Sequence, residues 1–168
     1  MPLLKACVDA VADINIENFY KHIAKILSIL YASFPAKTAI YVDDVAGIDE
    51  PDEYGLHSPH YTAGFFSLLW LADEGFIRFQ DCIRQDGIDQ AVLTNRAFLK
   101  LTEISEPIYT ASKIADEETA NVVNIAPQKE LSPSIIEEQK LIINQLRQAL
   151  RSRDSIAIYK VVNHILHF

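Results

Sequence analysis

The chain has 168 residues, with 15 Lys or Arg against 23 Asp or Glu, so its formal net charge is -8. Apolar residues make up 49% of the sequence, which is typical of a globular protein and excludes a disordered or fibrous one. The chain can bury a substantial core but is too short for a TIM barrel of about 250 residues. Its negative charge disfavours nonspecific binding to nucleic acid or to an anionic membrane surface.

The sequence predicts a cytoplasmic protein. Residues 1–13 contain one Lys, an early Asp9 and no long apolar core, so they do not resemble a signal peptide. No apolar run approaches the ~20 residues that a membrane-spanning helix requires. The two cysteines, Cys7 and Cys82, have neither a metal-ligand nor a redox spacing, and we expect no disulfide framework.

The first long element is predicted to be a helix over about 15–33, after a lead segment of residues 1–14. Asp13 or Asn15 can cap this helix, and Pro35 ends it. Apolar residues recur along it at intervals of three and four residues, as in an amphipathic helix: Ile16, Phe19, Ile23, Ile26, Leu27, Leu30 and Phe34.

A short β-branched stretch over 37–42 then predicts a strand, followed by a short helix near 43–47 and a polar loop. Ser58 and Pro59 are typical of a helix start, and Gly75 of a helix end. The remaining elements of this half are predicted as a strand over 76–84, a hairpin turn at Asp86-Gly87, a return strand over 90–94 and a helix over 95–101.

Residues 102–132 are predicted to form a long acidic connector, with a short strand at about 121–125. A connector of this length is uncommon inside a compact domain, and it could wrap the surface or cross to another subunit. Two helices should follow, over about 133–151 and 155–167. Because the link between them is so short, we expect residues 133–168 to form an antiparallel helical hairpin.

The order of these elements over residues 15–101, about half of the chain, resembles the winged helix, a helix-turn-helix with a two-stranded wing. The stretch "FFSLLWLADEGFIRFQ" looks like the end of a recognition-type helix, its terminal glycine and the first wing strand. "QDGID" looks like the wing tip, and "AVLTNRAFLKL" looks like the return strand and the next helix. The predicted fold is therefore mostly α with a small β-hairpin (α+β).

The resemblance implies duplex DNA as one ligand, because winged helices of the DNA-binding type place this helix in the major groove and their wing near phosphates. The residues argue against that role. The matching helix contains no Lys or Arg, and residues 36–60 hold six acids and one Lys. As the alternative, dimerisation could bring the basic residues of two wings into one positive face: Arg78, Arg84, Arg96 and Lys100.

The outward side of the same helix is predicted to carry an aromatic ridge of Phe66 and Trp70, four residues apart, between Thr62 and Asp73. A helix that is apolar all round is usually buried all round. One interpretation is that the connector or the C-terminal helices cover this ridge. The other is that Phe66, Trp70, Thr62 and Asp73, with Ile142 and Leu146, contact a second chain, either another copy or a partner.

Chemical motifs are weak. His57 and His60 are three residues apart beside acids and form a candidate metal site, although a helix start with an incidental His pair explains them more simply. The acidic stretch fails the calcium-loop template, because Tyr54 stands where the closing Glu belongs. The glycines form no phosphate-binding loop, and we expect no cofactor.

Three functional hypotheses follow. The first is a non-enzymatic winged-helix protein that acts through protein contacts, as a homodimer or as an adaptor for a partner. The second is a DNA-binding transcriptional regulator. The third is a metal-binding protein or hydrolase at His57 and His60, which would need bound metal and a concave pocket.

Overall fold

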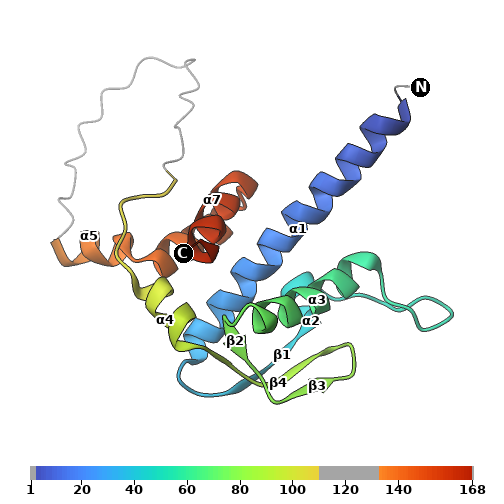
Figure 1. Cartoon of the computed structure of the whole chain (residues 1–168), viewed down its shortest axis with the longest axis horizontal. Coiled ribbons are helices and arrows are strands. Elements are labelled where there is room, and N and C mark those ends of the chain that lie inside the picture. Colours follow the sequence, from blue (N-terminus) through green and yellow to red (C-terminus); the bar gives the residue numbers. More distant parts are fainter. Residues whose placement is uncertain (1–2, 110–132, 168) are drawn as a thin grey trace, which may run out of the picture.

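The computed structural model describes residues 3–109 and 133–167 and belongs to the α+β class (Figure 1). Within these residues there are seven helices and an antiparallel sheet of four strands. Within the same residues, no helix combines the length and apolarity that crossing a bilayer requires.

Helix α1 (Leu3–Ser33) begins twelve residues before the predicted start at Asn15. The sequence explains the difference, because no Gly or Pro interrupts residues 3–33 and Ala and Leu, both strong helix formers, are frequent before Asp13. Asp13 and Asn15 therefore lie inside the helix rather than at its cap. Its end at Ser33, just before Pro35, is as predicted.

The sheet is organised around its last strand, β4 (Gly87–Leu93). One neighbour is β1 (Thr38–Tyr41), which leads directly into the short helix α2 (Val42–Ala46). On the other side of β4 lie β2 (Ile77–Arg78) and β3 (Asp81–Ile83), both antiparallel to it. The single strand predicted over 76–84 is thus two strands, because Gln90 of β4 adopts a left-handed conformation (φ 53°) opposite the gap and interrupts the pairing.

The hairpin turn lies at residues 84–86 rather than at Asp86-Gly87. Arg84 adopts a positive φ of 51°, and the backbone N–H of Asp86 donates to the carbonyl of Ile83 (2.9 Å). Gly87 is already in β4, where a Cβ would lie 2.3 Å from the carbonyl oxygen of Ile40. The glycine is therefore needed for the close approach of two strands and not for the turn itself.

Helix α3 (Pro59–Asp73) begins as predicted, because the Ser58 hydroxyl oxygen accepts a hydrogen bond from the backbone N–H of Tyr61 (3.3 Å). After α3 the chain turns at Gly75, which adopts a φ of 74°. Helix α4 (Asn95–Thr102) is capped by Thr94, whose hydroxyl group also donates to the carbonyl of Gly75 (2.7 Å). This hydroxyl joins the start of α4 to the end of α3.

The helix predicted over 133–151 is two helices, α5 (Pro133–Lys140) and α6 (Ile142–Ser152), separated by an extended Leu141 that pairs with Ile104. The buried side chain of Gln145 stabilises this break. Its amide group accepts from the backbone N–H of Ile108 (2.9 Å) and donates to the carbonyls of Ser105 (3.0 Å) and Lys140 (3.1 Å). The strand expected at 121–125 lies outside the described residues.

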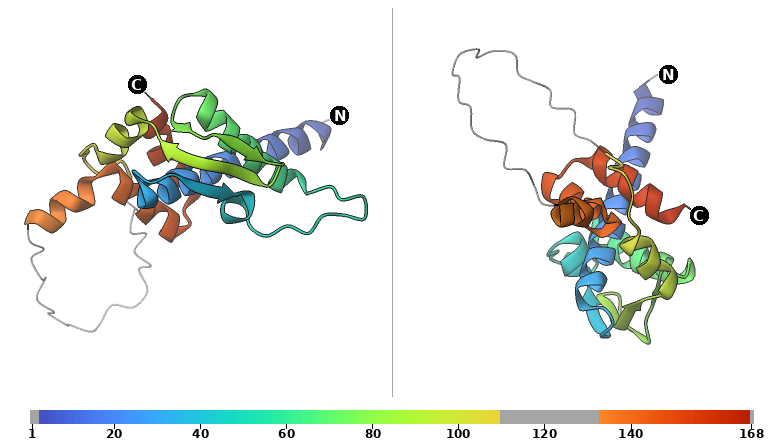
Figure 2. Two further views of the ribbon diagram at one scale, coloured as in Figure 1. Left: turned by 90° about the horizontal axis from the view of Figure 1, so that it is seen from below. Right: turned by 90° about the vertical axis from the view of Figure 1, so that its left-hand side faces the viewer.

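The final helix, α7 (Ser155–Leu166), is capped by Asp154 and packs against both α6 and α1. Helix α1 therefore lies at the centre of one continuous core, with α3 and β4 on one side and α6 and α7 on the other (Figure 2). Ile142 and Leu146 are fully buried in this core. Their predicted role at an interface between chains is wrong, since they cover α1 of their own chain.

We expect Leu146→Ala to lower the free energy of unfolding by about 2–5 kcal/mol, because it leaves a cavity in the core beside α1. Leu99→Ala is the matched control, since Leu99 is 58% exposed and should lose less than about 1 kcal/mol. Urea denaturation of both variants measures the difference. Equal losses would contradict the buried position of Leu146.

Candidate functional site

Helix α3 presents an exposed aromatic side chain on its outer face. Phe66 is 59% exposed, whereas Phe65 and Leu68 point into the core. Trp70 does not stack on Phe66 as predicted. Its ring meets Phe19 of α1 edge to face, with 5.0 Å between centroids and 84° between planes. The predicted ridge is therefore divided, with Trp70 covered by α1 and Phe66 left at the surface.

A narrow cleft of about 10 Å³ lies beside Phe66, between the first turns of α3 and the β3–β4 turn. Its lining residues are His57, Tyr61, Thr62, Phe65, Phe66 and Gln85. Thr62, one of the predicted interface residues, lies in this lining, and its hydroxyl group donates to the carbonyl of Ser58 (3.1 Å). Asp73, another of them, is exposed at the opposite end of α3. The structure therefore brings Thr62 and Phe66 together but leaves Asp73 apart from the cleft.

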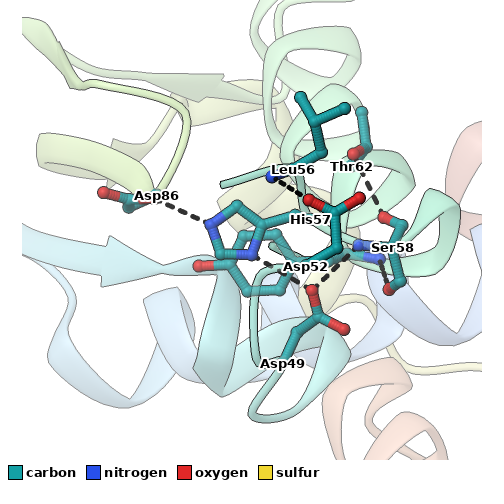
Figure 3. Close-up of polar contacts among 8 residues, drawn as sticks. Asp49, Asp52, Leu56, His57, Ser58, Thr62 and Asp86 are labelled. Carbon is teal, nitrogen blue, oxygen red and sulfur yellow. Dashed lines mark hydrogen bonds and ion pairs between the residues drawn. The ribbon is translucent and has the colours of Figure 1, made fainter. Parts of the chain in front are cut away.

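His57 joins the acidic loop before α3 to the β3–β4 turn (Figure 3). Its Nδ1 lies 3.1 Å from a carboxylate oxygen of Asp49, and its Nε2 lies 3.7 Å from a carboxylate oxygen of Asp86. Its ring stacks on Tyr61, with 4.1 Å between centroids and 14° between planes. The imidazole therefore lies between the loop and the turn and packs against the start of α3.

Carboxylates also order the loop itself. Asp52 accepts hydrogen bonds from the backbone N–H groups of Tyr54 and Leu56, both at 2.9 Å, and Figure 3 shows the bond from Leu56. Asp49 accepts from the backbone N–H of Ser58 (2.9 Å), and this bond is the main cause of the lowered pKa of Asp49, with smaller contributions from the Ser58 side chain and from His57. Both carboxylates thus bind the chain leading into α3.

The hydroxyl group of Tyr61 lies among negative charges. Burial is the largest cause of a rise in the pKa of Tyr61 to about 12, and the carboxylates of Asp43, Asp86 and Asp49, with a hydrogen bond to Asp43, account for the rest of that rise. The aromatic lining of the cleft is therefore bordered by three carboxylates, which gives this end of α3 a negative potential.

A buried histidine of α1 lies beneath α3. His22 of α1 is 1% exposed, and its Nδ1 lies 3.4 Å from the hydroxyl oxygen of Ser67. That hydroxyl donates to the carbonyl of Ala63 (2.8 Å), so Nδ1 must carry the proton that bridges the pair. The Nε2 of His22 is buried without a partner. Burial, assisted by the nearby His60 and Lys25, lowers the pKa of His22 to about 4.

The four predicted nucleic-acid residues do not form one free cationic surface. The Arg96 guanidinium donates to the carbonyl of Glu74 (3.0 Å) and lies 4.6 Å from the centroid of the Phe76 ring. Lys100 pairs with Glu103 (3.1 Å). Arg78 and Arg84 are exposed, on β2 and at the β3–β4 turn.

The candidate metal ligands point to different places. His57 contacts Asp49 and Asp86, whereas the Nε2 of His60 lies 3.1 Å from the carbonyl oxygen of Ala46. Within residues 3–109 and 133–167, no group of three or more His, Cys, Asp or Glu side chains could hold a metal ion. His60 instead lies beside His22, with 5.0 Å between ring centroids.

Sequence reasoning missed two connections at this site. Asp86 reaches His57 only because β4 positions the turn beside the acidic loop, and nothing in the local sequence indicates that pairing. His22 carried a usable signal, because it lies between Phe19 and Ile26 at the spacing of the buried apolar stripe of α1.

Comparisons of the chain with known protein families, with curated proteins and with solved structures find no match.

We expect the free energy of unfolding to fall as the pH drops from about 6.5 to about 4, with His22 contributing about 3 kcal/mol of the loss. In this range the unfolded chain binds a proton at His22 that the folded chain excludes, so the stability is present above pH 6.5 and lost by pH 4. His22→Leu should remove this part of the pH dependence.

Urea denaturation at a series of pH values measures the effect, and His167→Leu, at an exposed histidine, is the control. Wild-type and His22→Leu curves that run parallel from pH 7 to about pH 4 would show that His22 does not titrate in this way.

Proposed function

We propose that this chain is a non-enzymatic winged-helix module that acts through protein contacts, with the outer face of α3 as its docking surface. The observation that carries the proposal is an exposed Phe66 beside a cleft with an aromatic lining, on a helix that contains no Lys or Arg. Exposed aromatic side chains next to clefts are typical anchors of protein interfaces.

The arrangement of residues 15–101 supports the winged-helix part of the proposal. Helix α1 is followed by a strand, two helices and a β-hairpin, and the hairpin strand β4 also pairs with β1. In this arrangement α3 takes the place of the recognition helix, and the β3–β4 turn takes the place of the wing tip.

The chemistry around the cleft favours a partner segment that is both apolar and basic. Asp43, Asp49 and Asp86 surround the Tyr61 hydroxyl group and would attract a cation. A guanidinium or ammonium group can lie against an aromatic ring while it pairs with a carboxylate. An apolar side chain next to that cation would cover Phe66. The carboxylates and the Phe66 ring would thus each contact one of two adjacent side chains of the partner.

Duplex DNA fits the same surface poorly. A phosphate backbone would meet the carboxylates that border α3, and two of the four predicted basic residues, Arg96 and Lys100, already have partners. Arg78 and Arg84 remain for phosphate contacts, with Asp81 on the adjacent strand. Most nonspecific affinity for DNA comes from attraction between basic side chains and phosphates. Here the carboxylates would repel the phosphates and oppose binding.

A cytoplasmic location accords with the free, exposed thiol of Cys82.

We expect a synthetic peptide of alternating Leu and Arg to shift the backbone amide resonances of Thr62, Phe66 and Gln85 in an NMR titration. The Arg side chains would pair with the carboxylates and the Leu side chains would cover Phe66. Phe66→Ser should weaken this binding by about tenfold, equivalent to about 1.4 kcal/mol. The same titration with a Leu-Glu peptide should leave these resonances unchanged.

Leu99→Ser is the matched control, since Leu99 is 58% exposed but lies on α4, and it should bind the peptide as the wild type does. A mixed-sequence DNA duplex of about 20 base pairs gives the competing result. Tight, salt-dependent duplex binding that shifts the resonances of Arg78 and Arg84 would replace the protein-contact proposal with the DNA-binding regulator.

A further inference from the structure

A second exposed apolar patch, separate from the cleft, lies where α1 and α7 meet. Ile16 and Tyr20 lie on one face of α1, four residues apart, and Ile156 and Tyr159 lie on one face of α7, three residues apart. The rings of Tyr20 and Tyr159 contact each other edge to face at 4.8 Å. Ile16 is 56% exposed and Ile156 is 59% exposed, so the four side chains form a continuous apolar surface.

Helix α1 continues beyond this patch. The Ser155 hydroxyl, in the first residue of α7, donates to the Glu17 carboxylate (2.5 Å), so α7 begins level with Glu17. The preceding part of α1, residues 3–16, extends for about 21 Å away from the body of the molecule (Figure 1). Ile14, Asn15 and Ile16 are all exposed. In the described part of the chain, α1 thus extends past its neighbours as an isolated helix, and isolated helices of this length are marginal in water.

We propose that a second copy of this chain covers the patch, with α7 of each copy lying against the projecting part of α1 of the other. In such a two-fold arrangement, the same surface of each copy forms the interface. It would place Ile156 and Tyr159 of one copy beside Ile14 and Ile16 of its partner. The proposal goes beyond the docking function, because it uses the α1–α7 face and leaves the Phe66 cleft open.

Charge complementarity favours a second copy. Residues 3–17 of the sequence contain three acids and one Lys, a net charge of -2, whereas α7 contains Lys160 and no acid. Lys160 is exposed and directly follows Tyr159 of the patch. Two-fold pairing would bring this cation to the acidic part of the partner's α1, once on each side of the axis.

The area that a stable dimer needs also favours a copy of the chain over a short peptide. Specific interfaces bury about 1,200–2,000 Å² in total, which four side chains alone do not provide. A second copy contributes its own patch and its own projecting helix, so every contact counts twice.

The test is the dimer dissociation constant, measured by sedimentation equilibrium on the full chain between about 1 and 200 μM. The wild type should dimerise in this range. Ile156→Asp should raise the dissociation constant by at least about tenfold, because it introduces a charge twice into the apolar contact. Lys160→Glu, at an exposed position where the ammonium group lies 5.3 Å from the centroid of the Tyr109 ring, should also raise it and provides a second variant should Ile156→Asp unfold.

Phe66→Asp is the matched control, since Phe66 and Ile156 are both 59% exposed but lie on different faces. Phe66→Asp should leave the dimer intact, and Ile156→Asp should still bind the Leu-Arg peptide. The experiment therefore tests dimerisation through α1 and α7 separately from docking at the Phe66 cleft. A monomeric wild type at the highest concentration would overturn the dimer. So would dissociation by Phe66→Asp alone, which would assign self-association to the α3 face.

Discussion

The structure depends on one constraint, which is that the apolar stripe of α1 must be covered on two sides. Ile23, Ile26, Leu27 and Leu30 are completely buried in one core cluster. Helix α3 and the sheet cover one side, while α6 and α7 cover the other (Figure 2). The C-terminal helices therefore belong to the same core as residues 15–101, and their apolar residues serve this chain before any partner. Outside this core, exposed apolar side chains lie on the outer face of α3 and at the edge where α7 meets α1.

The carboxylates near α3 have a structural role as well as an electrostatic one. Asp49 and Asp52 use backbone N–H groups to shape the loop, and His57 connects Asp49 to Asp86 across to the turn. Backbone donors lower the pKa of Asp49, so its charge is retained well into the acidic range. The same carboxylates that shape the loop therefore also repel phosphate, so no further acidic residues are needed for that discrimination.

Local chemistry explains which elements the sequence could predict. Ser58, Pro59 and Gly75 act within a few residues of their own positions, and so does the cap that Thr94 provides for Ala97. The helix ends at these residues lie where the sequence predicts them. The errors come from distant partners. Leu141 breaks a helical pattern because it pairs with Ile104, and Trp70 leaves the predicted ridge because Phe19 covers it. At the candidate site, Phe66 and Thr62 could be found from helical spacing, whereas Asp86 needed the fold of the sheet.

The two close glycine contacts have a mechanical consequence. At Gly87 the backbone of β4 lies directly against Ile40 of β1, and at Gly64 the backbone of α3 lies against Val42 and Ala46 of α2, where a Cβ would be 3.0 Å from each. Strand β1 runs straight into α2, so these contacts join the hairpin to α3 through a single short segment of chain. At Gly87 the close neighbour is the backbone of Ile40, and at Gly64 the close neighbours are the side chains of Val42 and Ala46. The turn that carries Gln85 and the helix that carries Phe66 are therefore connected through two contacts that only a glycine can make without a shift of its neighbours.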